Sequence, residues 1–186
     1  MVAEVVAGKF MKKIILLIIF LFLSACLPQK QTNLNINNIA MKITSPAFEH
    51  NKNIPAKYTC DGENINPPLQ ITEIPNNTQS LVLISDDPDA PMGTWVHWTI
   101  WNISPQTENI AENSSPSNAT EGLTSFGKPG YGGPCPPSGT HRYFFKIYAL
   151  DTNLELSVDS KKDDLEQAMA NHVLDSAELI GLYQRQ

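Results

Sequence analysis

The sequence predicts one mainly β domain that closes with a helix, and three observations support this. From Met41 onward the apolar runs have the length of strands, and Ser, Asn, Gly and Pro separate them. The chain has 14 prolines in 186 residues, which favours loops and strand edges over long helices. Helical spacing of apolar residues is seen after Ser160. We therefore place the folded domain at residues 41–186.

Three segments carry the strongest strand signals. Leu81–Ile84 is an apolar run too short for a helix, and it leads directly into an acidic segment. Both alternating faces of Trp95–Ile103 are largely apolar, so we expect this strand to be central in its sheet. The segment His141–Leu150 alternates in the same way. One of its faces carries His141, Tyr143, Phe145, Ile147 and Ala149.

The C-terminal segment is predicted to be one helix. Ser160 is a suitable N-cap, and Asp163 and Asp164 would lie in the first turn, where negative charge is favoured. Apolar residues then recur at intervals of three and four: Leu165, Met169, Val173, Ala177 and Ile180. We expect this stripe to pack on the core, with a partner-binding face as the alternative.

The N-terminus has the features of an export signal. Lys12 and Lys13 precede the apolar run 14–23, which is shorter than the roughly 20 residues of a membrane-spanning helix. The sequence Leu-Ser-Ala-Cys at 23–26 resembles the lipobox of bacterial lipoproteins, which implies cleavage before Cys26 and lipidation of that residue. We assign residues 1–25 to a lipoprotein signal peptide, with Met11 as an alternative start, and 26–40 to the lipidated Cys26 and a flexible tether. An ordinary cleaved signal with a free Cys26 is the alternative.

These assignments predict a protein of the bacterial cell envelope that faces the periplasm and reaches the membrane through Cys26. Leu27 after the cysteine is compatible with transfer to an outer membrane, in an organism that has one. The net charge of −6 and the lack of a basic stripe argue against nucleic acid as a partner.

Candidate site residues gather where the predicted strands begin or end. Asp87 and Asp89 flank Pro88, so their side chains can point the same way, and two close carboxylates need a compensating partner. His97 and His141 lie near the starts of two strands and could meet those carboxylates. The alternatives are Asx turns for the aspartates and packed core positions for the histidines.

Arg142 follows His141 in its strand, so its side chain points to the opposite face. We expect it to be a buried structural cation, in an ion pair with Asp86.

Four segments resemble the phosphatidylethanolamine-binding protein family, most closely its bacterial branch of Raf-kinase-inhibitor-like proteins. Asp86–Pro91 with Trp95–Trp98, and Gly133–Phe145, are similar to the two signature blocks, and Tyr58–Leu69 also fits the branch. The resemblance spans residues 41–186. It implies an antiparallel β-sandwich core with peripheral helices and a small pocket for anions such as phosphate or phosphate-bearing head groups.

The resemblance also implies which residues form the pocket: Asp87, Asp89, Trp95, His97, Pro136, His141 and Tyr143. A short loop, 138–140, precedes His141, whereas animal members of the family have a longer one. Ligand size and kinase-related activities are therefore not carried over. No cofactor or metal is implied.

Cys60 and Cys135 lie in loops of the resembling segments. In an exported protein two remaining cysteines favour a disulfide, with free buried thiols as the alternative.

The predicted function is that of a lipid-anchored binding protein, not an enzyme, that takes up a small anionic or phosphorylated ligand or modulates a protein partner. A phosphoester hydrolase that uses the aspartates and histidines as an acid–base pair or as metal ligands is the second hypothesis. Against it, the sequence has no Gly-x-Ser-x-Gly or His-Glu-x-x-His motif. An inhibitor of proteases or kinases that acts through the pocket rim is the third.

Overall fold

The computed structural model describes residues 40–185. The signal peptide, Cys26 and nearly all of the tether predicted from the sequence lie outside the described residues. Within the described part of the chain, no helix is long and apolar enough to cross a membrane.

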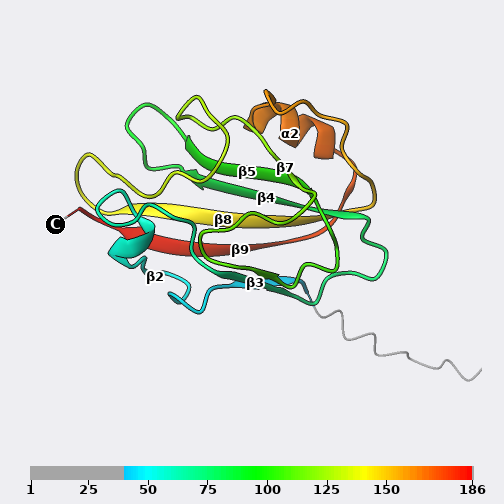
Figure 1. Cartoon of the computed structure of the whole chain (residues 1–186), viewed down its shortest axis with the longest axis horizontal. Coiled ribbons are helices and arrows are strands. Elements are labelled where there is room, and N and C mark those ends of the chain that lie inside the picture. Colours follow the sequence, from blue (N-terminus) through cyan, green and yellow to red (C-terminus); the bar gives the residue numbers. More distant parts are fainter. Residues whose placement is uncertain (1–39, 186) are drawn as a thin grey trace, which may run out of the picture. The chain divides into compact units, whose positions relative to one another are not determined.

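Two sheets form the core, as the resemblance implied (Figure 1). The smaller sheet has the order β1-β3-β6, with β1 at Lys42–Thr44, β3 at Leu69–Thr72 and β6 at Asn109–Ile110. The larger has the order β2-β9-β8-β4-β5-β7. Its strands are β2 (Lys52–Asn53), β4 (Ser80–Asp87), β5 (Trp95–Ile103), β7 (Thr120–Glu121), β8 (His141–Leu150) and β9 (Val173–Tyr183). All pairs are antiparallel except β2 with β9.

Each face of the larger sheet is covered by a different layer. The smaller sheet packs on one face, and the main core cluster lies between them, with Ile43, Ile71, Leu83 and Phe145 among its members. On the other face, α2 (Lys162–Met169) packs over a second cluster through Leu165 and Met169. A 3-10 turn, η1 (Ala56–Tyr58), is the other helical element described.

The strand predictions hold closely at β5 and β8, whose observed bounds equal the predicted ones. Both strands have apolar positions on alternate sides because both faces of the larger sheet are covered. As expected, β5 is not an edge strand: it pairs with β4 on one side and with the two-residue β7 on the other, although it is second from the end of the sheet.

The predicted C-terminal helix is wrong in its second half and at its start. The helix begins after Lys161, whose backbone N–H donates to the Asp164 carboxylate at 2.9 Å, and it ends at Met169. Asn171 then adopts a left-handed conformation with φ 68°, which helices do not continue through. The residues from Val173 onward form β9, which pairs along its length with β8. Helical spacing and strand alternation both fit this segment, and sheet pairing decided between them.

The burial of Leu165 on the core side of α2 gives a test of how this helix packs. Leu165 is fully buried in the second cluster, so Leu165→Ala should lower the free energy of unfolding by about 2–5 kcal/mol through lost contacts and a cavity. Gln167→Ala, on the exposed side of the same helix, is the control and should change stability by less than about 0.5 kcal/mol. Equal effects of the two substitutions in urea unfolding would contradict this packing.

Candidate functional site

The candidate site lies at one end of the larger sheet, where three strand ends meet. β4 ends at Asp87, which pairs with Trp95 at the start of β5, and β8 begins at His141 on the other side of β4. Because neighbouring strands are antiparallel, the end of β4 lies beside the starts of both other strands. Segments distant in the sequence thus contribute to one site.

Asp87 and His141 form a buried pair. His141 Nδ1 lies 2.7 Å from Asp87 Oδ2, and the two residues are 7% and 3% exposed. Since a carboxylate only accepts, the His141 Nδ1–H donates. The other oxygen, Oδ1, accepts the backbone N–H of Asp89 at 2.8 Å. Both carboxylate oxygens are therefore partnered, and the ring orientation of His141 is fixed.

A β-bulge places His97. Ser85 pairs with Trp98 and Asp86 pairs with Val96, so His97 is the extra residue on β5 and has no partner on β4. Bulges turn a side chain to a different face, and the His97 ring lies edge-on to Tyr143, with centroids 5.2 Å apart. Simple alternation along the strand would not have predicted this contact.

His97 Nδ1 donates to the carbonyl of Gly132 at 2.5 Å, since a carbonyl can only accept. Burial lowers the pKa of His97 below its ordinary value, against the opposing effects of the Gly132 bond and the charges of Asp87 and Asp86. The free ring is therefore neutral at pH 7. Glycine at 132 also lets Phe126 lie against this backbone, because a Cβ there would be 2.2 Å from Phe126 Cε2.

Tyr143 brings a hydroxyl without a partner. The residue is 1% exposed, and its OH is buried with no hydrogen bond among the described residues. Burial and the nearby Asp87 charge raise its pKa, so the phenol keeps its proton. A buried unpaired hydroxyl costs about 1–3 kcal/mol, which makes this position an exception that needs an explanation.

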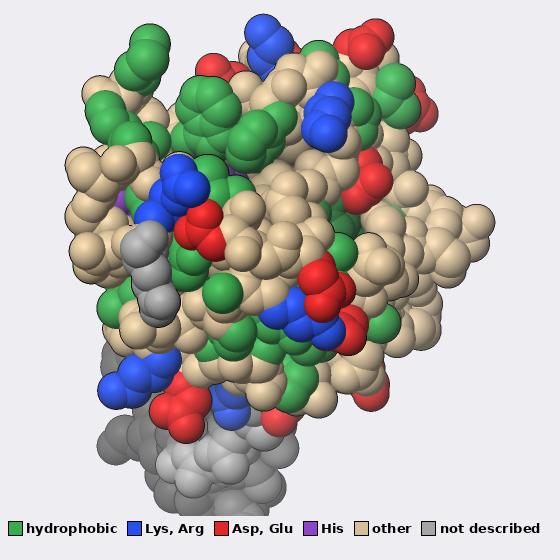
Figure 2. Space-filling model, turned by 60° about the vertical axis from the view of Figure 1, so that its left-hand side comes forward, with side chains coloured by type: hydrophobic (Ala, Val, Ile, Leu, Met, Phe, Trp, Pro, Cys, Tyr) green, Lys and Arg blue, Asp and Glu red, His purple; other side chains and the backbone are tan. Residues whose placement is uncertain are grey.

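These side chains surround a cavity of about 340 Å³, a size that suits a small ligand. Its polar groups come from Asp87, His97, His141 and Tyr143, and the rest of its wall is largely apolar. The apolar and cysteine lining residues are Ala90, Pro91, Met92, Trp95, Phe126, Cys135, Pro136 and Pro137. Figure 2 shows hydrophobic side chains gathered on this side of the molecule, with small areas of histidine visible between them.

Six of the seven residues that the resemblance implied line this cavity, and Asp89 does not. Asp89 instead makes a two-pronged ion pair with Arg142, with Arg142 Nε and Nη2 at 2.9 and 2.7 Å from its two oxygens. This pair lowers the pKa of Asp89 to about 2. Whether the six cavity residues bind a ligand stays a prediction.

The predicted Arg142–Asp86 ion pair is wrong. Arg142 is exposed, and its partner is Asp89. Asp86, which is 1% exposed, is paired with Lys146 at 2.8 Å and Lys162 at 3.2 Å. The reason is strand alternation: Lys146 lies four residues further along the same face of β8, and α2 brings Lys162 over that face.

Several residues that line the cavity were not predicted from the sequence, among them Phe126 and Met92. Phe126 comes from the long segment between β5 and β8, and Met92 from the turn after β4. No periodic signal marks such positions in irregular loops. Ala90, Pro91 and Pro137 were inside the quoted motifs and could have been included.

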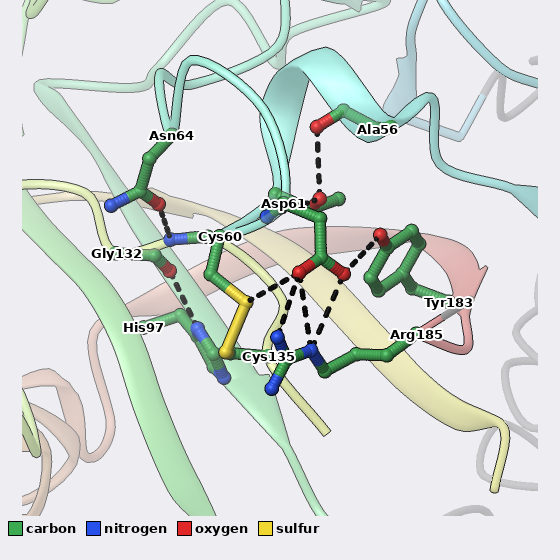
Figure 3. The surroundings of a disulfide bond; sticks show 11 residues. Ala56, Cys60, Asp61, Asn64, His97, Gly132, Cys135, Tyr183 and Arg185 are labelled. Atoms are coloured by element: carbon green, nitrogen blue, oxygen red, sulfur yellow. Dashed lines mark hydrogen bonds and ion pairs between the residues drawn. A yellow bond between two sulfur atoms is a disulfide. The ribbon is translucent and has the colours of Figure 1, made fainter. Parts of the chain in front are cut away.

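Cys60 and Cys135 are joined by a disulfide, with their Cα atoms 5.4 Å apart (Figure 3). The bridge ties the loop after η1 to the cavity wall. A backbone bond from Cys60 N–H to the Pro134 carbonyl and one from Gly133 N–H to Asn64 Oδ1 hold the same two segments together. Asp61, next to the bridge, accepts hydrogen bonds from Tyr183 and Arg185, and these lower its pKa.

No group of three or more His, Cys, Asp or Glu within residues 40–185 is arranged to hold a metal ion. Asp87, His97 and His141 lie close together, but two of them use their Nδ1 atoms for other bonds. These three side chains can form hydrogen bonds and an ion pair with a small polar group.

A small, mostly apolar pocket with a few polar groups, such as the one at this end of the larger sheet, is the usual form of a ligand site. The sequence model of the family described as phosphatidylethanolamine-binding protein matches residues 44–184. This chain belongs to that family, as its motifs had indicated, and the fold supports a ligand-binding role.

Relatives agree with this assignment. The UPF0098 protein of Methanothermobacter thermautotrophicus is 49% identical over 150 residues, covering 78% of this chain and 99% of the relative. The structure of a phosphatidylethanolamine-binding protein homolog from Chlamydia trachomatis has a TM-score of 0.77 and 43% identity, covering 79% of this chain and 99% of that one. YbcL of E. coli, described as a new member of the mammalian family, has a TM-score of 0.74 and 27% identity, covering 78% and 99%.

Removing the disulfide gives a test of the cavity wall. The Cys60→Ser/Cys135→Ser double variant should lose about 2–4 kcal/mol of unfolding free energy, because the bridge closes a long loop. Urea unfolding with and without reductant checks this: reductant should destabilise the natural chain and leave the double variant unchanged. Two free thiols in the folded, unreduced protein would contradict the bridge.

Proposed function

We propose that the cavity binds a small anion, phosphate or a phosphate-bearing head group, and that the chain acts as a binding protein. The observation that carries this proposal is the convergence of unsatisfied hydrogen-bonding groups on one cavity. His97 and His141 both use Nδ1 for bonds within the protein, so that Nε2 of each ring is left for a ligand. The Tyr143 hydroxyl, buried without a partner beside them, adds a third group.

Ligand oxygens would satisfy these groups. A protonated imidazole donates from Nε2, and the phenol of Tyr143 donates from its hydroxyl. Hydrogen bonds to a charged oxygen are worth about 1.5–3 kcal/mol each, more than bonds between neutral groups. The Asp87 carboxylate balances a charged His141 from behind, which explains why an acidic residue belongs in a site for anions.

His141→Ala should weaken binding of O-phosphoethanolamine by about tenfold or more, because one charge-assisted hydrogen bond is lost. His172→Ala is a matched control: His172 Nδ1 also bonds an aspartate, Asp151, at 2.7 Å, but on the exposed surface. Isothermal titration calorimetry of the purified full-length variants measures both affinities.

Tyr143→Phe guards against a folding defect in the His141 variant. Loss of an unpartnered hydroxyl should leave the free energy of unfolding unchanged or higher, while it weakens binding of the ligand. Unchanged affinity in both site variants, or equal loss in His172→Ala, would refute the proposed site.

We further propose that the protein is exported and anchored through acyl chains on Cys26, so that the cavity faces the space outside the cytoplasmic membrane. A disulfide in the cavity wall supports this, since disulfides persist in oxidising compartments. The lipobox-like sequence at 23–26 supplies the modification site.

In bacterial cells, the natural chain should be in the membrane fraction and carry the mass of acyl chains on Cys26, and Cys26→Ala should remove that mass. Mass spectrometry and membrane fractionation measure these changes. A natural chain with an unmodified Cys26, found in the soluble fraction, would contradict the anchor.

A further inference from the structure

The cavity has no permanent positive charge. None of its lining residues is Lys or Arg, and one of them, Asp87, is an acid. Arg142 follows His141 in the chain, but its guanidinium is held by Asp89 on the surface. A buried anion without a compensating charge is strongly disfavoured. The positive charge that the proposed ligand needs must therefore come from the imidazoles.

The neutral His97 ring is held in the tautomer that accepts a hydrogen bond from the ligand. His97 Nδ1–H donates to the Gly132 carbonyl and His141 Nδ1–H donates to the Asp87 carboxylate. A neutral ring with its proton on Nδ1 has a lone pair on Nε2. A lone pair facing an anion would repel it, whereas His97 Nε2 becomes a donor once the ring takes up a second proton.

The surroundings keep the His97 ring neutral until a ligand arrives. Its burial lowers its pKa, although two acids of β4, Asp86 and Asp87, oppose this effect. From β8, His141 and Tyr143 face it, and the segment that carries Phe126 and Gly132 supplies one carbonyl and an apolar ring.

His141 has its own set of charged neighbours. It faces Asp87 of β4 and Tyr143 of β8, and it pairs in register with Tyr183 of β9. Asp89 and Arg142 neutralise one another beside it.

We propose that the cavity acquires its positive charge by proton uptake on His97 as the anion enters. This inference rests on the proposed function, the capture of a small anion. Binding is then linked to pH: affinity falls as pH rises, by about tenfold per pH unit for each proton taken up. The dependence disappears at low pH, where the free His97 ring already carries the proton.

Sulfate is the sharpest probe, because it does not titrate between pH 5 and 9 and any proton taken up must go to the protein. Calorimetry of the full-length protein with sulfate and with inorganic phosphate, at pH 7.5 in buffers of different ionisation enthalpy, gives the number of protons per ligand. We expect uptake of up to one proton with sulfate, and an affinity that is at least tenfold higher at pH 6 than at pH 7.5.

His97→Gln removes one titrating ring while keeping polar atoms near Gly132, and it should reduce uptake by up to one proton. His172→Gln, the same change at an exposed histidine, should leave uptake unchanged. Binding of both anions with no proton uptake, or uptake that is the same in His97→Gln and in the natural chain, would overturn this inference alone. No binding of either anion from pH 5.5 to 8 would overturn the proposed function as well.

Discussion

The buried carboxylate of Asp87 is the group on which the site depends. It lies at the last position of β4 and accepts hydrogen bonds from His141 on β8 and from the Asp89 backbone in the following turn. An ionised carboxylate this deeply buried is costly unless every oxygen is partnered. The two bonds meet that requirement, and in doing so they fix the end of one strand, the start of another and the turn between β4 and β5.

The remaining wall of the cavity is fixed by backbone features. A bulge in β5 turns His97 toward Tyr143, and the Gly132 carbonyl holds its ring. The disulfide of Cys60 and Cys135 fastens the segment opposite, where closely spaced prolines leave the backbone few conformations. Both imidazole rings are thus held through their Nδ1 atoms, His97 by the Gly132 carbonyl and His141 by Asp87, so little of their conformational entropy would be lost when a ligand binds.

Much of this arrangement could be predicted from local sequence, and the failures have physical causes. β5 and β8 were predictable because apolar residues on both alternating faces mark strands covered on both sides. The predicted helix past Met169 is wrong because Ala177, Leu179 and Tyr183 alternate as in a strand and pack on the main core cluster, and the pairing with β8 that selects the strand is a long-range effect. The predicted Arg142–Asp86 pair is wrong because Lys146 and Lys162 bind that carboxylate instead, and the sequence alone does not show that these two lysines lie beside Asp86. The bulge at His97 and the position of Phe126 depend on tertiary structure, and no sequence pattern marks them.

The apolar part of the cavity and its polar groups act together. Trp95 and Phe126 meet edge-on, with centroids 5.5 Å apart, and Phe126 lies edge-on to His97 as well. His97 itself is only 4% exposed, and this burial lowers the local dielectric and disfavours a charge on its ring. The same low dielectric strengthens the attraction between a protonated ring and a bound anion. Burial therefore disfavours the charge on His97 when no anion is bound and favours it when one is bound, so the charge on the ring depends on the ligand.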